Sequence, residues 1–390
     1  MIFATGCGPS GDEGPFVRAV PDGFFGVNGQ HLRPLPGAGK DEELENHLEE
    51  IEAAGIDFVR ANVDWRQLEP LAPVRGEHRF DFASHDVWMQ ALAEHHLAWQ
   101  LVGQGIPTPD WAASQTGLAA QCGSRSPPER AGDLASLMAG LARRYGRGGS
   151  FWQEHSRVPY EPVIEYEIWN EPNHGAFWCP TPDPEAYADL YLQAQRAIHA
   201  VDPKATVLTG GLAGFKQSES LGPEPLYLGV DEFLSRMVAQ RPSLRDAVDA
   251  VAVHAYEPEA EQVVSDIGWY RGELEEAGLG DAPMSVNEVG WPTQGQSGSP
   301  VPEAERASKL RELADAIART DCGVVSFAPH TWVTEELDPA DYQDWYGISA
   351  PRTGDPYPSA VAYAEVVDLF EGRGSEPPPH ETLTLCAGDD

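Results

Sequence analysis

Positive charge is scarce in this sequence, and lysine above all. The chain has 390 residues, and its 62 Asp and Glu outnumber 26 Lys and Arg, which gives a formal net charge of −36 at pH 7. Such a surface repels phosphate backbones and anionic lipids, so we expect neither nucleic acid nor a membrane surface as a partner. Schiff-base chemistry is not expected either, because no lysine ends a predicted strand; the lysines are Lys40, Lys204, Lys216 and Lys309.

Three further patterns are missing from the sequence. No segment approaches the roughly 20 consecutive apolar residues of a membrane span. No glycine-rich turn follows the first predicted strand, which argues against a dinucleotide-binding sheet. No metal-ligand spacing occurs either, since the run Glu94-His95-His96 does not place its side chains as ligands. We therefore expect no membrane span, no metal and no other cofactor.

The five cysteines carry information by position. Cys122 and Cys179 follow the third and fourth predicted strands, whereas Cys322 precedes the eighth and Cys386 lies near the end of the chain. Two disulfide bonds between these neighbours would fit an oxidising compartment, and buried free thiols are the alternative. On this basis we expect a secreted or cell-surface protein.

The ends of the chain differ in composition from its middle. Residues 1–20 are rich in Gly, Pro and acids and predict a flexible tether, and residues 372–390 predict a coil-like tail. Cys7 follows small residues in FATGCG, as the acylated cysteine of a bacterial lipoprotein does. Only six residues precede it, so a truncated start and a chance likeness both remain open.

Residues 21–371 alternate between short apolar runs and amphipathic segments. This alternation predicts parallel strands joined by helices, and eight such units predict a single (β/α)₈ TIM-barrel domain, with an open doubly wound sheet as the alternative. The expected strands cover 23–28, 57–65, 97–102, 163–171, 206–209, 249–255, 284–288 and 324–328. The expected helices cover 42–54, 84–95, 129–145, 184–200, 231–239, 259–277, 303–319 and 359–370.

Polar side chains gather where these strands end, and that end of a barrel carries the active site. Solvated loop residues would explain one or two of them, but six strands showing the same pattern on their inward phase favours a substrate site. The residues expected to bind there are Arg60, Asn62, Gln104, Asn170, His174, His254, Tyr256 and His330. Tryptophans at or beyond strand ends suit stacking on sugar rings; they are Trp65, Trp111, Trp178, Trp291 and Trp332.

Two carboxylates stand out among these residues. Glu171 ends the stretch VIEYEIWNEP, and Glu288 ends PMSVNE, so each follows an apolar strand. A pair of carboxylates is what cleavage of a glycosidic bond requires, one as the acid and the other as nucleophile or base. Ordinary solvated acids are the alternative in so acidic a chain. Glu167 lies about 13 Å deeper along its strand at roughly 3.3 Å per residue, so we expect a structural acid paired with a base such as Arg60.

The sequence resembles the retaining glycoside hydrolases of clan A, and most closely family 39. The segments that carry this likeness are YEIWNEPN, FDFASHDVWMQALAEHHLAWQLVGQGIPTPDWA, LARRYG, DPEAYADLYLQAQRAIHAVDPKATVLTGGLAG and VAVHAYEP. The resemblance implies that Glu171 is the general acid and base, that Glu288 is the nucleophile, and that Asn170 binds the sugar 2-hydroxyl. It also implies retention of configuration and a carboxyl separation of about 5 to 5.5 Å. The acid role leads us to expect a raised pKa for Glu171.

Alternatives remain open at this level. The segment NEVGWPT resembles family 17 glucanases, and family 5 is a further possibility. About 60 residues follow His330, fewer than the roughly 100 of the β-sandwich that family 39 xylosidases carry after the barrel. A non-catalytic barrel that binds polysaccharide and a transglycosylase are the competing functions. The expected partner is a carbohydrate, and the expected state is a monomer.

Overall fold

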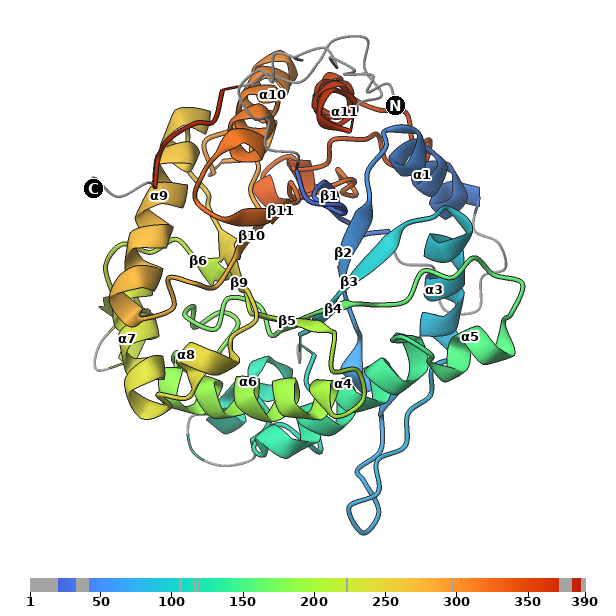
Figure 1. Ribbon diagram of the computed structural model, residues 1–390, viewed down its shortest axis with the longest axis vertical. Helices are drawn as coiled ribbons and strands as arrows, with labels where there is room; N and C mark the ends of the chain where they lie inside the picture. The colour runs from blue at the N-terminus through green and yellow to red at the C-terminus, as the bar shows by residue number, and fades with distance from the viewer. Residues whose placement is uncertain are drawn as a thin grey trace, which may run out of the picture.

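The computed structural model describes residues 20–32, 42–104, 107–114, 117, 119–221, 224–296, 298–371 and 381–386. In this part of the chain, parallel strands form a ring that helices surround, as Figure 1 shows. The ring strands are β1 (Gly26–Asn28), β2 (Phe58–Asn62), β3 (Ala98–Gly103), β4 (Glu165–Ile168), β5 (Thr206–Thr209), β9 (Val251–His254), β10 (Met284–Glu288) and β11 (Val324–Phe327). The order and type of these elements confirm the predicted α/β TIM-barrel fold.

The ring consists of two parallel sheets. One has the order β1-β2-β3-β4-β5, and the other has the order β11-β10-β9-β6, where β6 is the short strand Leu212–Ala213. Single parallel bridges, Phe25 with Phe327 and Leu208 with Ala250, connect the sheets at the two seams, where the ladders themselves are interrupted. All strands of the ring therefore point the same way, so their carboxyl ends share one face of the molecule.

Each of the eight ring strands is followed in the chain by a helix on the outside of the ring (Figure 1). Between β5 and its helix the chain also forms β6 and a hairpin. These helices are α1 (Glu42–Ala53), α3 (Ala83–Glu94), α4 (Ala131–Tyr145), α6 (Pro184–His199), α7 (Val230–Gln240), α9 (Ala260–Ala277), α10 (Glu303–Arg319) and α11 (Pro358–Phe370). The start of α6 follows local chemistry: Asp183 caps the helix by accepting from the Ala186 amide, and Pro184 occupies the first turn, where no amide donor is needed.

Shorter elements fill the loops. They are the helical turns α2 (Trp65–Leu68), α5 (Ser150–Glu154) and α8 (Leu244–Ala247), the 3₁₀ turns Ala119–Gln121, Gly123–Arg125 and Tyr342–Trp345, and the antiparallel hairpin β7 (Glu219–Leu221) and β8 (Glu224–Tyr227). The second strand ends at Asn62 rather than at the expected Trp65, because Asp64 accepts from the Gln67 amide and starts α2.

The main core lies between the ring and the helices. Helix α4 shows why: its residues at helical spacing, Leu134, Leu137, Met138 and Leu141, are fully buried against the strands. The outward phase of β2, Val59 and Ala61, belongs to the same cluster. The inward phase is different, because it carries charged and amide side chains that build the site described below.

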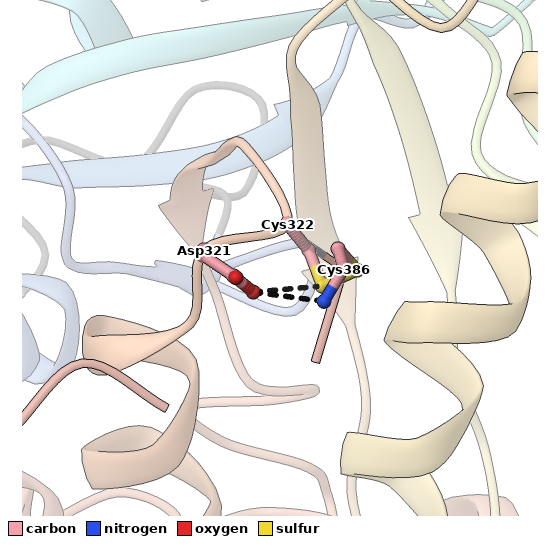
Figure 2. A group of neighbouring side chains, drawn as sticks. All are labelled: Asp321, Cys322 and Cys386. Carbon is pink, nitrogen blue, oxygen red and sulfur yellow. Dashed lines mark hydrogen bonds between the residues drawn. A yellow bond between two sulfur atoms is a disulfide. The ribbon is translucent and has the colours of Figure 1, made fainter. Parts of the chain in front are cut away.

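Two disulfide bonds join the four cysteines in the pairs expected from the sequence. Cys122 and Cys179 connect the segment after β3 to the loop after β4. Cys322 and Cys386 hold residues 381–386 beside the start of β11, where the Asp321 carboxylate accepts from the Cys386 amide at 2.9 Å (Figure 2). The same carboxylate accepts from the Leu385 amide at 2.8 Å.

The structure describes only part of the two terminal segments. Cys7 and residues 1–19 of the predicted tether lie outside the described residues, as do 372–380 and 387–390 of the predicted tail. Among the residues that are described, no helix is both long and apolar enough to cross a membrane.

Candidate active site

Glu171 and Glu288 lie side by side where β4 and β10 end. One oxygen of each carboxylate and a ring nitrogen of His254 all lie within 4.8 Å of one another. Glu288 is the last residue of β10, whereas Glu171 follows the end of β4 by three residues. Trp169 and Glu171 have left-handed backbone angles, φ 75° and 41°, and the Glu171 amide donates to the Gly211 carbonyl at 3.0 Å. This turn bends the chain and brings Glu171 to Glu288, at a conformational cost typical of functional sites.

Arg60 of β2 organises the layer beneath the two carboxylates. Its guanidinium is buried, and all five of its N–H groups have an acceptor. Two donate to Glu167 at 2.7 and 2.8 Å, one to Glu288 at 2.5 Å, and one each to Asn28 at 2.8 Å and Asn170 at 3.0 Å. The expected pairing of Glu167 with Arg60 is thus present, and the pKa of Arg60 is raised further by both acids although burial opposes this.

Glu288 is held in its ionised form. Burial alone favours the neutral acid, but the charges of His254, Arg60 and His330 outweigh it and hold the pKa of Glu288 at about 2. The Tyr256 hydroxyl donates to the second carboxylate oxygen at 3.1 Å. A carboxylate with these donors is ionised at neutral pH, as a nucleophile must be.

The pKa of Glu171 is lowered, although the sequence led us to expect a raised value. Burial and the charge of Glu288 do raise the pKa of its carboxyl group, but two imidazoles outweigh them and lower it below the usual value. The His174 Nδ1 lies 3.2 Å from one carboxylate oxygen, and the His254 Nδ1 lies 2.9 Å from the other. The prediction was wrong because hydrogen bonds to the charged form compete with burial. The pKa of the neighbouring His254 is raised instead, because the charges of Glu288 and Glu171 outweigh the effect of burial.

A cavity of about 570 Å³ opens above these groups. Of the residues predicted to form the site, those that line it are Gln104, Asn170, Glu171, His174, His254, Tyr256, Glu288, Trp291 and His330. Arg60 and Asn62 lie behind this lining, where the Asn62 amide donates to the Gln104 carbonyl oxygen at 2.5 Å. His330 is buried, which lowers its pKa to about 4, so its ring is neutral near pH 7.

Four of the five predicted sugar-binding tryptophans do not line this cavity. Trp332 is 1% exposed, and its indole N–H donates to the His47 imidazole of α1 at 3.2 Å. Trp111 packs edge-on against Trp65 with ring centroids 5.8 Å apart and donates to the Glu69 carbonyl. Both were misplaced because a position at the end of a strand does not fix the direction of the side chain. Trp65 and Trp178 are buried as well.

Sequence reasoning missed several residues of this site. Asn28 of β1 orients Arg60, and Asn287 donates to Glu167 at 2.7 Å. The cavity lining also includes Gln30, Phe177, Phe215, Tyr342 and Tyr346. The aromatic run DYQDWYG after the eighth strand was a usable signal for the last two. For Phe215 there was none, since its place depends on a hairpin that the sequence pattern does not reveal.

Among the residues that the structure describes, two groups of side chains have donor atoms close enough to hold a metal ion. In the first, Glu171, His254 and Glu288, the carboxylates are already bonded to Arg60, Tyr256 and the imidazoles. In the second, Asp321, Cys322 and Cys386, the two sulfur atoms are bonded to each other (Figure 2). Metal ligation by cysteine needs a thiolate, which a disulfide cannot supply.

Comparison with known proteins finds similarity in structure only. No protein-family model matches the sequence, nor does any curated protein. A glucosidase from Croceicoccus marinus matches with a TM-score of 0.65 and 16% identity, over 91% of this chain and 69% of that one. A monomeric beta-xylosidase from Caulobacter crescentus CB15 matches with 0.60 and 22%, over 89% and 69%. The fold is the one these enzymes share.

Further structures fit the same pattern. A GH5_18 protein from Streptomyces cattleya, solved in complex with GlcNAc, matches with a TM-score of 0.59 and 17% identity, over 93% of this chain and 83% of that one. The neighbours thus come from families 39 and 5, both named by the sequence resemblance, and from family 51. At these identities the likeness establishes the barrel, and the chemistry has to be argued from the site itself.

Proposed function

We propose that this chain is a retaining β-glycosidase, with Glu288 as nucleophile and Glu171 as general acid and base. The observation that carries the proposal is the pair of carboxylates, whose nearest oxygens lie within 4.8 Å at the base of the cavity. Retaining enzymes place their carboxyl groups about 5 to 5.5 Å apart, whereas inverting enzymes need about 6.5 to 9.5 Å to admit a water molecule. The observed spacing fits the first arrangement.

In the first step, a Glu288 oxygen attacks the anomeric carbon as the bond to the leaving oxygen breaks. The leaving oxygen takes a proton from the Glu171–His254 pair, and the sugar becomes an ester of Glu288. Arg60 and Tyr256 keep Glu288 ionised and aimed before the attack. Asn170 accepts from Arg60 through its Oδ1, which leaves its Nδ2 to donate to a sugar hydroxyl.

In the second step, water replaces the leaving group. Glu171 takes a proton from the water, whose oxygen attacks the anomeric carbon and releases Glu288 as a carboxylate. The sugar leaves with its original configuration, because two inversions cancel. The proton gained by Glu171 restores the pair to its starting state.

The negative charge of the cavity limits the class of sugar that it can bind. Its wall carries Glu171, Glu257 and Glu288, so an acidic sugar would meet repulsion, and we propose a neutral β-linked sugar. The structurally similar proteins include a glucosidase and a beta-xylosidase, so glucosides and xylosides are the first substrates to test. The two disulfide bonds support export to an oxidising compartment, and the monomeric neighbour supports a monomer.

The test is hydrolysis of aryl β-xylosides and β-glucosides by the parent and by Glu288→Ala and Glu171→Ala. We expect no turnover by Glu288→Ala. Glu171→Ala should lose about 10²- to 10⁴-fold on a poor leaving group and far less on an activated one. Glu312→Ala, an exposed acid of α10, is the control that should match the parent.

The product itself decides the stereochemistry. Proton NMR of the first sugar released should show the β-anomer, and a first-formed α-anomer would contradict the double displacement. Binding of polysaccharide without turnover would instead favour a non-catalytic barrel. Products longer than the substrate would identify sugar transfer, which uses the same two residues.

A further inference from the structure

An aromatic wall stands beside Glu171. Its four rings are those of His174 and Phe177 after β4, Phe215 after β6, and Tyr227 of β8. Phe215 and Tyr227 are stacked with centroids 3.9 Å apart, and His174 packs edge-on against Phe215 at 5.3 Å and Phe177 at 5.7 Å. His174, Phe177 and Phe215 line the cavity and are only partly buried. These rings therefore present an apolar surface to a ligand.

The hairpin that supplies Tyr227 is attached to the segment carrying Glu171. Strand β8 runs antiparallel to this segment: Gly175 donates to the Leu226 carbonyl at 2.8 Å, and Leu228 donates to the Asn173 carbonyl at 2.9 Å. The Asn173 amide group in turn donates to the Ala213 carbonyl of β6 at 2.8 Å. The wall and the acid are thus built on one hydrogen-bonded unit, which fixes their relative position.

The position of the wall selects its ligand. A general acid must touch the oxygen of the group that departs, so the ring bound beside Glu171 is the leaving group. The rings of a second set, Tyr256, His330 and Tyr346, pack on one another and line the cavity together with Glu288, to which the Tyr256 hydroxyl donates at 3.1 Å. The sugar that forms the ester has to lie beside Glu288. The two sets divide the cavity between the two halves of the substrate.

Charge decides between classes of leaving group. The Lys216 ammonium, the cation nearest the wall in sequence, lies 2.7 Å from Asp266 and 3.6 Å from Glu257. Among the described residues that line the cavity there is no lysine or arginine, whereas Glu171 and Glu257 are both present, so the lining disfavours an acidic ring. A neutral sugar offers such a site the C–H face of its ring, which packs on aromatic side chains.

We propose that His174, Phe177, Phe215 and Tyr227 form the binding site for the leaving-group sugar of a neutral β-linked saccharide. This inference rests on the proposed glycosidase function and adds the part of the substrate that the two carboxylates do not specify. The same site would receive the acceptor sugar in a transglycosylation reaction. Attack of an acceptor sugar on the glycosyl-enzyme ester is the reverse of the step in which the leaving-group sugar departs.

The experiment compares two substrates of the same sugar, a β-linked disaccharide and the β-glycosyl fluoride, whose leaving group has no ring. For Phe215→Ala we expect kcat/KM on the disaccharide to fall about tenfold, with the fluoride within about twofold of the parent. Phe215→Trp should retain the disaccharide activity. Tyr160→Ala, an exposed aromatic before β4, is the matched control.

Each other result overturns the proposal. Equal losses on both substrates would make Phe215 a support for Glu171 and not a ligand contact. No loss on either would show that the wall binds nothing, and a loss confined to aryl glycosides would replace the sugar with an aryl group. Failure of the parent on the fluoride as well as the disaccharide would instead refute the glycosidase function on which the inference depends.

Discussion

Arg60 is the central positive charge of the candidate active site. Its single positive charge is shared by Glu167 and Glu288, and its pKa is raised, so it stays charged at any working pH. Together with Glu171, these acids leave the layer with an excess of negative charge. The His254 Nδ1 lies 2.9 Å from Glu171 and 3.5 Å from Glu288, and its raised pKa favours a proton there that would offset this excess. The protonation of the site is therefore a property of the group rather than of Glu171 alone.

The pH dependence of kcat/KM should follow this proton. Glu288 has a pKa of about 2 and remains ionised throughout the range above it, so it sets no limit there. The pKa of His254 is raised from 6.5, and increasing pH through the raised value removes the proton that the leaving group needs. We expect the basic limb to have its midpoint above pH 6.5, measured with a disaccharide substrate.

Replacing His254 by Gln tests this assignment. The proton must then reside on the Glu171 carboxyl group alone, so the basic limb should move to lower pH. A limb that stays in place in His254→Gln would show that another group holds the proton.

Gly211 sets the space available to the same imidazole. A Cβ atom added to Gly211 would lie 1.9 Å from the His254 Nε2, far inside van der Waals contact. We expect Gly211→Ala to displace His254 and to reduce kcat at least about tenfold, in assays on any accepted glycoside.

Gly272 is the matched control for this substitution. It lies inside α9, and a Cβ atom there would meet nothing within 4 Å. Gly272→Ala should stabilise the protein by about 0.5 to 1 kcal/mol and leave kcat unchanged, because alanine loses less backbone freedom in a helix. Equal kcat values for the two variants would contradict the role given to Gly211.

The C-terminal segment is the element that the barrel holds by a covalent bond. Leu383 pairs with Thr320 in a single bridge, and the disulfide between Cys322 and Cys386 closes a loop of 64 residues (Figure 2). Closing such a loop stabilises the folded state by about 4 kcal/mol in the chain-entropy account. Cys386→Ser should lower the free energy of unfolding by up to that amount in urea titrations, with kcat unchanged.

Reduction supplies the comparison for this prediction. Dithiothreitol reduces both disulfide bonds of the parent protein. If the bond between Cys322 and Cys386 supplies the stability that is lost, the reduced parent should unfold at the same urea concentration as untreated Cys386→Ser. A variant as stable as the oxidised parent would show that residues 381–386 are held by their hydrogen bonds alone.

The sequence predicts the positions of helices and strands well and the directions of side chains poorly. Strong periodicity located the helices and strands of the ring to within a few residues, because each buries one continuous apolar face. The hairpin was missed, since its strands are only three and four residues long and Pro225 interrupts the strand pattern. Glu171 and Glu288 were recognisable by position, but the lowered pKa of Glu171 depends on His174 and also on His254, which is 83 residues away and reaches it only in the folded barrel.

The whole molecule carries a net charge of −36, which no local pairing removes. Repulsion among like charges weakens the compact state, and salt screens it as the Debye length falls from about 10 Å at 0.1 M to about 3 Å at 1 M. We expect the Tm to rise by several degrees between these NaCl concentrations. Sucrose of equal osmolality is the control, and an equal rise in sucrose would assign the effect to solute exclusion instead.

The fastened C-terminal segment has a consequence for how the molecule could face a solid polymer. Residues 320–322 and 381–386 lie at the end of the ring where β11 begins, and Val20 lies before β1, whereas the cavity opens where the strands end. A chain immobilised through either end of this described region would turn its mouth outward, toward the medium. On a bead or another solid support, such an orientation would leave the cavity open to solutes in the medium.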